Sequence, residues 1–291
     1  MKVFVTGATG FTGSRVVPLL LQNGFEVCCL HRPTSDRSLL PQPEIEWALG
    51  DVSDTRALSA LMRGADILVN IASLGFGHAD SIIRATVDAG IQRAIFVSTT
   101  AIFTQLNAGS RKVRVAAETA IQNSGLNYTI LRPTMIYGSD RDRNICRLIN
   151  WLKIFPFFPV FGDGNNLQQP VHVDDVAQAI LGSLKSDAAI CKNYNIAGKH
   201  PLTYNQLIDV IAIQMNRHIW KIHIPSKPVV SMLRLFEQIR LPFPIKSEQV
   251  LRLNENKNFS YEEAQRDFKY RPCSFEEGIR LELNQMQIIT T

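Results

Sequence analysis

The chain is 291 residues long, which is enough for one large domain or two unequal ones around a sizeable hydrophobic core. It is 45% hydrophobic and 20% charged, and its net charge of +5 is spread along the sequence. This balance argues against a nucleic-acid partner but suits an anionic ligand or an anionic membrane surface. The five cysteines have no metal-ligand spacing, which indicates buried thiols in a reducing compartment. Without a signal peptide or an apolar window long enough to span a bilayer, we expect a cytoplasmic protein, with membrane association left open.

The N-terminus predicts a phosphate-binding turn. Residues 2–6 form a short apolar, β-branched run, and residues 16–21 read as a helix, with Gly7, Gly10 and Gly13 between them. Glycine allows a tight turn and lets a ligand approach the backbone closely. The helix start offers unpaired N–H groups and a positive dipole end to a pyrophosphate. We interpret the stretch as a dinucleotide site, and the alternative is a tight turn without a ligand.

The end of the second predicted strand, residues 25–30, bears on the choice of cofactor. In an NAD enzyme a carboxylate at this point holds the ribose hydroxyls. Here Arg32 and Pro33 follow the strand, with Arg37 nearby and Arg15 in the first helix. A guanidinium group matches a phosphate by bidentate, charge-assisted hydrogen bonds. The pattern therefore favours NADP, although NAD remains open and a solvated basic loop is the alternative.

Strands and helices alternate through the next part of the chain. Further strands are predicted over residues 45–49, 67–72, 94–97, 128–131 and 193–198, and helices over 55–62, 81–89, 113–123, 176–184 and 204–215. This alternation predicts an α/β Rossmann fold, a doubly wound parallel sheet with right-handed crossovers. We assign residues 1–143 and 166–199 to the cofactor domain, and residues 144–165 and 200–291 to a smaller substrate lobe.

Acidic residues at two places in the sequence can be explained by a ligand contact or by helix capping. Asp51, after the third strand, is a candidate for contacting the adenine ring, with a helix cap in this loop as the alternative. Asp174 and Asp175 follow His172, but we expect them to cap the next helix rather than bind a metal, because aspartate accepts bonds from the first N–H groups of a helix.

The chain resembles the extended branch of the short-chain dehydrogenase/reductase family. The motifs that carry the resemblance occur in the family's order: Thr6-Gly7-Ala8-Thr9-Gly10-Phe11-Thr12-Gly13, Gly50-Asp51-Val52, Asn70-Ile71-Ala72, Ser98-Thr99-Thr100, residues 131–138, Phe161-Gly162-Asp163-Gly164, residues 170–177 and a closing helix over 264–278. The resemblance implies a cofactor held by Gly7, Thr9, Gly10, Phe11, Thr12, Gly13, Arg32, Asp51, Val52, Ala72, Arg114 and Pro133. Homodimers are common in this family, although no pattern here indicates one.

The family's chemistry uses a tyrosine as proton donor, a lysine four residues later and a serine or threonine that steadies the same substrate oxygen. Thr99 falls on the hydroxyl position, flanked by Ser98. If Glu118 marks the helix register, Arg114 occupies the lysine position and Ser110 the tyrosine position. An arginine does not readily release a proton, so the chain resembles an atypical member of the family. Lys112 would occupy the lysine position in place of Arg114 only if the register of the helix is shifted.

A substitute proton donor is needed if the protein is an enzyme. Tyr137 is the first candidate, since it closes the strand that follows Arg132 and Pro133. The alternative is that Tyr137 packs in the core, and that a water molecule or a substrate group supplies the proton.

Two apolar segments bear on the substrate. Residues 150–161 contain four phenylalanines, a tryptophan and two prolines, and residues 229–245 mix apolar side chains with Arg234 and Arg240. A mildly basic amphipathic segment can lie on a membrane interface. Together they suggest a lipid-linked or bulky apolar substrate and peripheral membrane contact, with a core loop as the alternative for the first segment.

Three functions follow. The first is an NADP-dependent reductase or epimerase acting on a sugar that is linked to a nucleotide or lipid diphosphate, because the motifs at 161–164 and 172–175 resemble those of sugar-nucleotide enzymes. The second is an NAD(P)-binding sensor or accessory subunit without turnover, which the missing tyrosine and lysine favour. The third is a reductase of a hydrophobic ketone.

Overall fold

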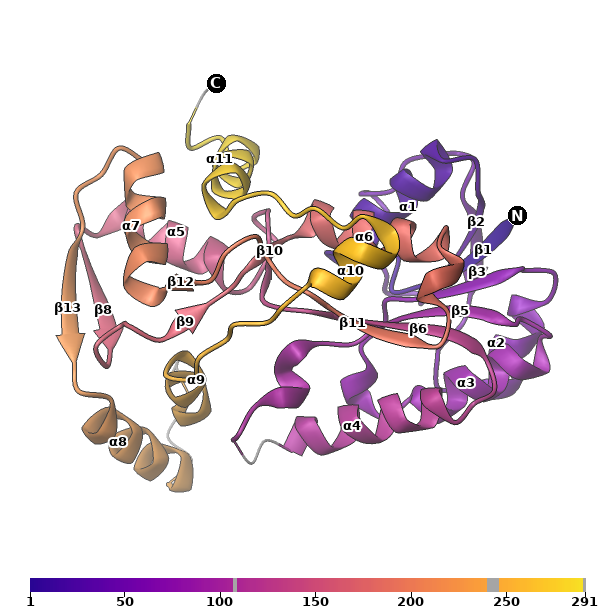
Figure 1. Cartoon of the computed structure of the whole chain (residues 1–291), viewed down its shortest axis with the longest axis horizontal. Coiled ribbons are helices and arrows are strands. Elements are labelled where there is room, and N and C mark those ends of the chain that lie inside the picture. The colour runs from indigo at the N-terminus through magenta and orange to yellow at the C-terminus, as the bar shows by residue number, and fades with distance from the viewer. Residues whose placement is uncertain (107–108, 240–245, 290–291) are drawn as a thin grey trace.

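The computed structural model describes residues 1–106, 109–239 and 246–289, and its centre is a seven-stranded sheet in which every pairing is parallel (Figure 1). The strand order is β11-β6-β5-β4-β1-β2-β3. The strands are β1 (Lys2–Thr6), β2 (Glu26–His31), β3 (Glu46–Leu49), β4 (Ile67–Asn70), β5 (Arg93–Val97), β6 (Asn127–Pro133) and β11 (Lys192–Ile196). The predicted doubly wound sheet is confirmed. The order reverses between β1 and β4, and ligands of such sheets bind at this switch point.

Helices cover both faces of the sheet, because alternate residues of each central strand point to opposite sides. Val3 and Val5 of β1 pack in the core beneath α1 (Gly13–Gln22) and α6 (Val173–Leu184), whereas Phe4 packs in the core of the opposite face. That opposite face is covered by α2 (Thr55–Met62), α3 (Ala79–Asp88) and α4 (Gly109–Gln122). Short 3₁₀ turns are η1 (Leu74–Phe76), η2 (Thr100–Phe103) and η3 (Asp187–Ala189).

The smaller lobe has its own hydrophobic core and lies beyond the carboxyl ends of the strands (Figure 1). Its helices are α5 (Ile145–Ile154), α7 (Tyr204–Gln214), α8 (Ser226–Gln238), α9 (Ser247–Leu253) and α11 (Phe275–Gln285). Three two-stranded sheets join them: β7 (Ile136–Tyr137) with β10 (Val171–His172), β9 (Leu167–Gln168) with β12 (Leu202–Thr203), and β8 (Phe157–Phe161) with β13 (Trp220–Ile224).

The predicted closing helix over residues 264–278 is wrong in extent. The segment forms two helices, α10 (Glu262–Phe268) and α11, separated by six residues. Lys269 ends α10 in the left-handed conformation, with a φ of 59°, and Pro272 lacks the N–H that would continue the helix. Ala264 of α10 and the following Tyr270 pack in the sheet core with α1 and α6, so this part of residues 200–291 lies against the cofactor domain.

The expected cap of α6 is also corrected. His172 is the N-cap residue, and its Nδ1 accepts a hydrogen bond of 3.3 Å from the backbone N–H of Asp174. Asp174 and Asp175 occupy the first turn instead, where their charge faces the positive end of the helix dipole. Among the described residues no cluster of histidine, cysteine and carboxylate side chains could hold a metal ion.

The last helix, α11, joins the two lobes. Gly278 lies against the Tyr137 hydroxyl, so that a side chain here would overlap it, and the rings of Tyr137 and Phe275 are 5.2 Å apart. At the other end of α11, Gln285 accepts a hydrogen bond of 2.5 Å from the Arg15 guanidinium of α1. The helix therefore fixes the position of the smaller lobe relative to the glycine turn.

One buried carboxyl group of α11, that of Glu282, forms no ion pair with any of the described residues. Glu282 is fully buried and faces Asp142. Burial, together with the contact to the Asp142 carboxyl group, raises the pKa of Glu282 to about 10, so Glu282 is protonated at neutral pH.

Replacing Glu282 with glutamine should change how stability depends on pH. The folded-state pKa lies above the unfolded one, so the unfolded chain binds fewer protons between roughly pH 4.5 and 10, and the wild-type protein loses stability as the pH rises through this range. Glu282→Gln cannot ionise. Chemical denaturation should show similar stability for both proteins at pH 5 and a variant that is more stable by about 1 kcal/mol or more at pH 9. The exposed Glu276→Gln is the control, and equal pH slopes in wild type and Glu282→Gln would contradict the prediction.

Candidate active site

The glycine turn can accept a pyrophosphate. Gly7 has a φ of 71°, and a Cβ atom there would lie 2.8 Å from the backbone nitrogen of Ala72. A Cβ atom at Gly13 would overlap the carbonyl oxygens of Gly7 and Ala8, so only glycine allows this turn to close. No acidic residue lies in the first turn of α1. The N-terminus of α1 therefore presents its dipole to the switch point with no carboxylate in its own first turn.

Three hydrogen bonds fasten the ends of β1 and β4 beside this turn. The Thr6 hydroxyl donates to Asn70 Oδ1 at 2.6 Å and accepts from the Ala72 N–H at 3.3 Å, and Asn70 Nδ2 donates to the Ala72 carbonyl oxygen at 3.1 Å. Thr6 and Asn70 are fully buried. Asn70, part of a predicted motif, thus shapes the crevice.

Of the three arginines considered for a phosphate group near the end of β2, two contact other side chains. The Arg15 guanidinium pairs with Asp174 at 3.5 Å and with Gln285, and Arg37 lies over the Trp47 ring at 5.3 Å. Arg32 is exposed and close enough to Asp51 to help lower its pKa.

The Asp51 side chain is hydrogen-bonded within its own loop. Its carboxylate accepts hydrogen bonds from the backbone N–H of Ser53 at 2.9 Å and from the Ser53 hydroxyl at 2.7 Å, and these bonds are the main reason why the pKa of Asp51 is lowered. The cap of α2 is Asp54, which accepts from the Ala57 N–H at 3.0 Å. The neighbouring Val52 packs against the core of this face of the sheet, and its carbonyl oxygen accepts a bond from Ser81.

A small cavity of about 220 Å³ brings together five of the predicted site residues. They come from the start of α1, the ends of β5 and β6, and α4: Thr12, Ser98, Thr99, Arg114 and Pro133. Gly10 and Phe11 line the neighbouring larger cleft, and Thr99 lines both spaces. Thr99 therefore lies where the two spaces meet.

The two predicted hydroxyl residues have different surroundings. Ser98 donates a hydrogen bond of 2.5 Å to the buried carboxylate of Glu118, which the Arg132 guanidinium also holds. Thr99 accepts a bond of 3.2 Å from the Ala101 N–H, and its hydroxyl proton stays available. The arrangement favours Thr99 for contacting a substrate oxygen, whereas Ser98 ties the carboxyl end of the central strand β5 to Glu118 of α4.

Arg114, which the resemblance places at the lysine position, lines the small cavity. Its Nη1 donates to the Ser110 hydroxyl at 3.1 Å, and its guanidinium packs over Gly75, where a Cβ atom would lie 3.1 Å from Nε. Burial, and to a smaller extent the positive charge of Arg252, lowers the pKa of Arg114. Arg114 lines the small cavity and Arg252 the larger cleft, so a cation borders each space. Ser110 lines neither space, and the exposed Lys112 does not either.

Tyr137 lies in the core, away from both spaces. It is 1% exposed, and its ring contacts those of His172 and Phe275 at 5.4 and 5.2 Å. Burial raises the pKa of the Tyr137 hydroxyl well above its ordinary value, which makes it a poor acid. The packing alternative, rather than proton donation, fits these contacts.

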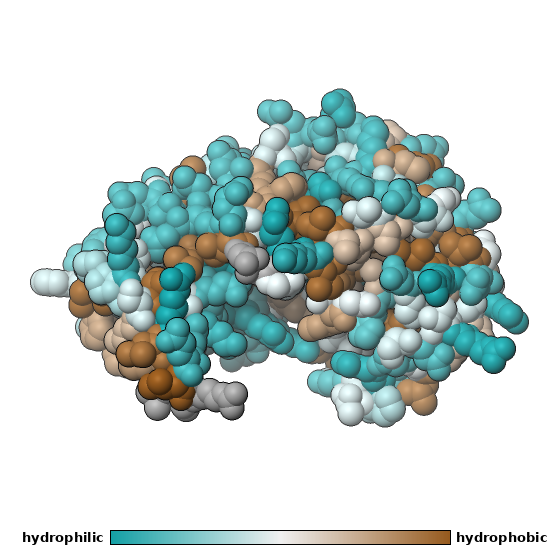
Figure 2. All heavy atoms as spheres, turned by 90° about the horizontal axis from the view of Figure 1, so that it is seen from below, coloured by the Kyte–Doolittle hydropathy of each residue, from teal (hydrophilic) through white to brown (hydrophobic). Residues whose placement is uncertain are grey.

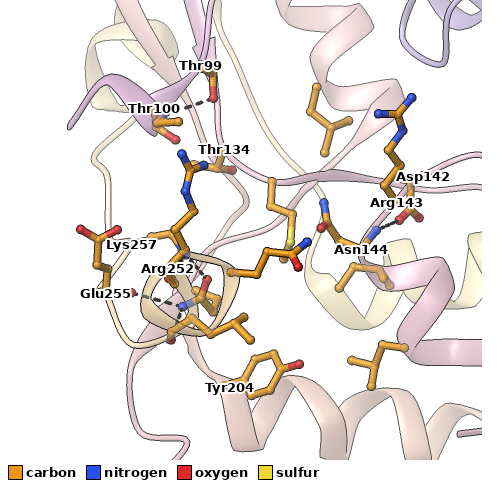
Figure 3. Close-up of a pocket in the computed structure, with 18 of the residues that line it drawn as sticks. Thr99, Thr100, Thr134, Asp142, Arg143, Asn144, Tyr204, Arg252, Glu255 and Lys257 are labelled. Carbon is orange, nitrogen blue, oxygen red and sulfur yellow. Dashed lines mark hydrogen bonds between the residues drawn. The ribbon is translucent and has the colours of Figure 1, made fainter. Parts of the chain in front are cut away.

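The larger cleft lies between the lobes, where Figure 2 shows the surface hollowed. It has a volume of about 1340 Å³. In Figure 3, Thr99, Thr100 and Thr134 line it from the sheet side, while Tyr204, Arg252 and Lys257 line it from the smaller lobe. Five cationic side chains border it: Arg141, Arg143, Arg147, Arg252 and Lys257.

The sequence reasoning missed all five of these cations. Arg141, Arg143 and Arg147 fall within seven residues directly after the motif that ends at Gly138, and that density was a usable signal. Arg252 and Lys257 gave no signal, because they lie more than a hundred residues away, on the short helix α9 and in the loop that follows it.

Lys257 is the one lysine that lines the cleft within the described ranges. Its Nζ donates to Gln168 Oε1 at 2.9 Å and to the Arg252 carbonyl oxygen at 2.5 Å. Burial lowers the pKa of Lys257 to about 8. An amine in this range can both accept and release a proton near neutral pH.

The predicted apolar segments divide between the cleft and the outer surface. Phe158, Pro159 and Phe161 line the cleft, whereas Trp151 and Phe157 face outward. Residues 229–239 of the second segment lie in and just beyond α8, and its remainder, including Arg240 and Ile245, is outside the described residues. Within the described ranges no helix combines the length and apolar character needed to cross a bilayer.

Comparisons with known proteins agree with this geometry. A family model described as NAD(P)H-binding matches residues 7–187. The chain is 28% identical over 273 residues to the mitochondrial NADH dehydrogenase (ubiquinone) 1 alpha subcomplex subunit 9 of Arabidopsis thaliana, covering 86% of this chain and 67% of that protein. It is 26% identical to the N-acetyl-alpha-D-glucosaminyl-diphospho-ditrans,octacis-undecaprenol 4-epimerase of Escherichia coli O157:H7, covering 77% of this chain and 75% of that protein.

Solved structures share the fold over almost the whole chain. UDP-glucose 4-epimerase of Thermotoga maritima superposes with a TM-score of 0.78 at 18% identity, covering 99% of each chain. UDP-glucuronic acid 4-epimerase of Bacillus cereus, solved with UDP-glucuronic acid and NAD, gives a TM-score of 0.76 at 19% identity, again covering 99% of each. The family match covers more than half of the sequence, and the chain therefore belongs to the NAD(P)H-binding family, with the fold of the extended short-chain dehydrogenases/reductases.

Proposed function

We propose that the protein is an NADP-dependent oxidoreductase or epimerase that acts on a hydroxyl or carbonyl group of a sugar linked to a nucleotide or lipid diphosphate. The observation that carries the proposal is the cationic cleft, which meets the small cavity at Thr99. The epimerase relative and the epimerase structures support the same class of reaction.

The residues around the switch point suit the cofactor. The glycine turn and the start of α1 would hold the pyrophosphate, Arg32 the 2′-phosphate, and Arg114 with Pro133 the nicotinamide riboside. When bound, the nicotinamide takes a hydride from the substrate carbon or returns it.

The cations of the cleft suit a diphosphate. Among the described residues, Arg143 and Arg147 form no ion pair with a carboxylate, and Arg252 pairs only with Glu248, at 2.7 Å. Guanidinium groups bind phosphate oxygens by bidentate, charge-assisted hydrogen bonds. A diphosphate in the cleft would place its sugar toward Thr99, where the lobes meet.

The proton must come from a group other than the family tyrosine. Oxidation of a sugar hydroxyl removes its proton while the hydride leaves the same carbon, and reduction returns both. We assign the oxygen contact to Thr99 and the proton to Lys257, because Lys257 is the cleft residue whose pKa is shifted toward neutrality.

Binding without turnover is a second candidate function. Ser110 and Arg114 occupy the tyrosine and lysine positions, and Ser98 is committed to Glu118. The Arabidopsis relative is named as a subunit of NADH dehydrogenase, which fits an accessory role. The arginines of the cleft argue against the third candidate, a reductase of a hydrophobic ketone.

Replacing Arg32 with alanine should reduce NADPH affinity about tenfold and leave NADH affinity almost unchanged, because one phosphate contact is lost. Fluorescence titration of the reduced nicotinamide measures both constants. Arg37→Ala is the matched control, since Arg37 is engaged with Trp47. Equal binding of the two cofactors by the wild type would contradict the NADP assignment, and no binding of either would remove the enzyme proposal.

Replacing Thr99 with valine should lower kcat about a hundredfold on an accepted UDP- or undecaprenyl-diphosphate-linked sugar, because the substrate oxygen loses its hydrogen-bond donor. Arg114→Ala should weaken cofactor binding as well as turnover. Tyr137→Phe is the control and should keep full activity. Unchanged turnover in both Thr99→Val and Arg114→Ala would show that the site is wrongly assigned, whereas tight NADPH binding without turnover of any sugar would favour the second function.

The protonation state of Lys257 should determine how kcat/KM depends on pH. In the oxidation direction the neutral amine acts as base, so kcat/KM should rise with pH and level off above about pH 8. Lys257→Arg keeps the charge but cannot release the proton, and it should lose about a hundredfold in kcat together with this pH limb. Initial rates between pH 6 and 10 measure the effect, with thermal melting as the check on folding. An unaltered pH profile in Lys257→Arg would rule out the assignment.

A further inference from the structure

The end of the smaller lobe that is farthest from the sheet carries a continuous apolar surface, which we call the apolar tip. Its side chains come from the end of α5, from β8 and from β13: Trp151, Ile154, Phe155, Phe157, Trp220 and Ile222. Trp220 and Ile154 are 69% and 68% exposed, and Ile222 is 50% exposed. Side chains of this size seldom lie exposed together unless the surface binds something.

The contacts show that these side chains form one surface. The Trp151 ring lies 4.6 Å from that of Phe155 and 6.3 Å from that of Phe157. Trp220 is the register partner of Phe157 in the parallel pair of β8 and β13. Strand alternation turns Val160 of β8 into the lobe core, so Phe157 and Trp220 share the outer face.

The polar group of Trp151 in the tip already has a hydrogen-bond partner within the protein. The indole N–H of Trp151 already donates a hydrogen bond of 2.8 Å to the Phe157 carbonyl oxygen, so burying this ring leaves no donor unsatisfied. Arg217 donates to the carbonyl oxygen of Lys153 beside it, which brings two cations to the edge of the tip.

Basic residues outnumber acidic ones around the tip, although Asp209 of α7 and Glu237 of α8 lie beside it. The segments that build it and lead into α8, residues 151–161 and 217–235, contain no aspartate or glutamate. They contain five basic residues, namely Lys153, Arg217, Lys221, Lys227 and Arg234. Lys221 is paired with Asp209 of α7 at 2.7 Å, and the other four form no ion pair within the part of the chain that the structure describes. A cationic rim around aromatic side chains complements an anionic lipid surface.

Helix α8 extends the surface. Met232, Leu235 and Ile239 follow one another at helical spacing and are exposed, while Val230 and Leu233 on the other side pack with Val250 of α9. Figure 2 shows hydrophobic side chains gathered at the left-hand end of the molecule, where α8 follows β13. A helix with an apolar stripe and flanking cations can lie in the plane of a membrane interface.

We propose that the apolar tip docks on the surface of a lipid bilayer that carries anionic headgroups. Strand β8 then connects the membrane to the cleft, because Phe157 belongs to the tip while Phe158 and Phe161 line the cleft. The docking does not require turnover, so it can be tested whether or not the proposed reaction is correct.

The test is sedimentation with vesicles of phosphatidylcholine and phosphatidylglycerol in a 3:1 ratio, and with vesicles of phosphatidylcholine alone. Wild-type protein should bind the anionic vesicles at low salt and release as salt is raised. Trp220→Ser with Ile222→Ser should reduce the partition coefficient about tenfold, and Lys153→Glu with Lys227→Glu should do the same on anionic vesicles. The matched control is Phe76→Ser with Val87→Ser, exposed apolar residues of the cofactor domain, which should bind as wild type does.

A second measurement locates the contact. Brominated lipids should quench the fluorescence of Trp151 and Trp220, the two tryptophans of the tip, in a Trp47→Phe variant, since Trp47 lies on the sheet side. Absence of vesicle binding by the folded wild type, or equal binding by the tip variants, would overturn the proposal. A concentration-dependent dimer that Trp220→Ser abolishes would overturn it too, because the tip would then bind a second copy of the chain.

Discussion

The hydrogen bonds between Thr6, Asn70 and Ala72 hold β1 and β4 together at the point where the strand order reverses. Both side chains are fully buried, so the bond between them is made without competition from water, and losing a partner would leave an unsatisfied buried group at a cost of about 1–3 kcal/mol. The glycine turn packs directly on this corner, because Gly7 touches the backbone of Ala72. The direction of α1, and with it the whole cofactor side of the crevice, depends on this small polar cluster.

The two sides of the crevice differ in how far they follow from the sequence. On the sheet side, the resemblance to the short-chain dehydrogenase/reductase family predicts Thr12, Thr99, Arg114 and Pro133, and the structure brings these residues to one cavity. Parallel strands end at the same edge, so a residue placed at a strand end is also placed in space.

On the other side, Arg252 and Lys257 could not be predicted, because they lie on a short helix and a loop whose positions depend on tertiary contacts rather than on periodicity. The cap of α6 was missed for a related reason: aspartate is a common cap, and only the fold shows that His172 accepts the bond. Tyr137 was placed correctly on its strand, but nothing local indicated that α11 would cover it.

Helix α11 is synthesised after every element with which it packs. Its Ile279 and Leu283 fill the core of the smaller lobe, Gly278 covers Tyr137, and Gln285 binds Arg15. A growing chain can form the sheet up to β11 before these residues exist, because domains fold from the N-terminus as they emerge. The smaller lobe, in contrast, keeps an open apolar side until α11 arrives. Assembly of the cleft therefore waits for the synthesis of α11, and chains interrupted before residue 275 would expose the apolar core of the smaller lobe to chaperones.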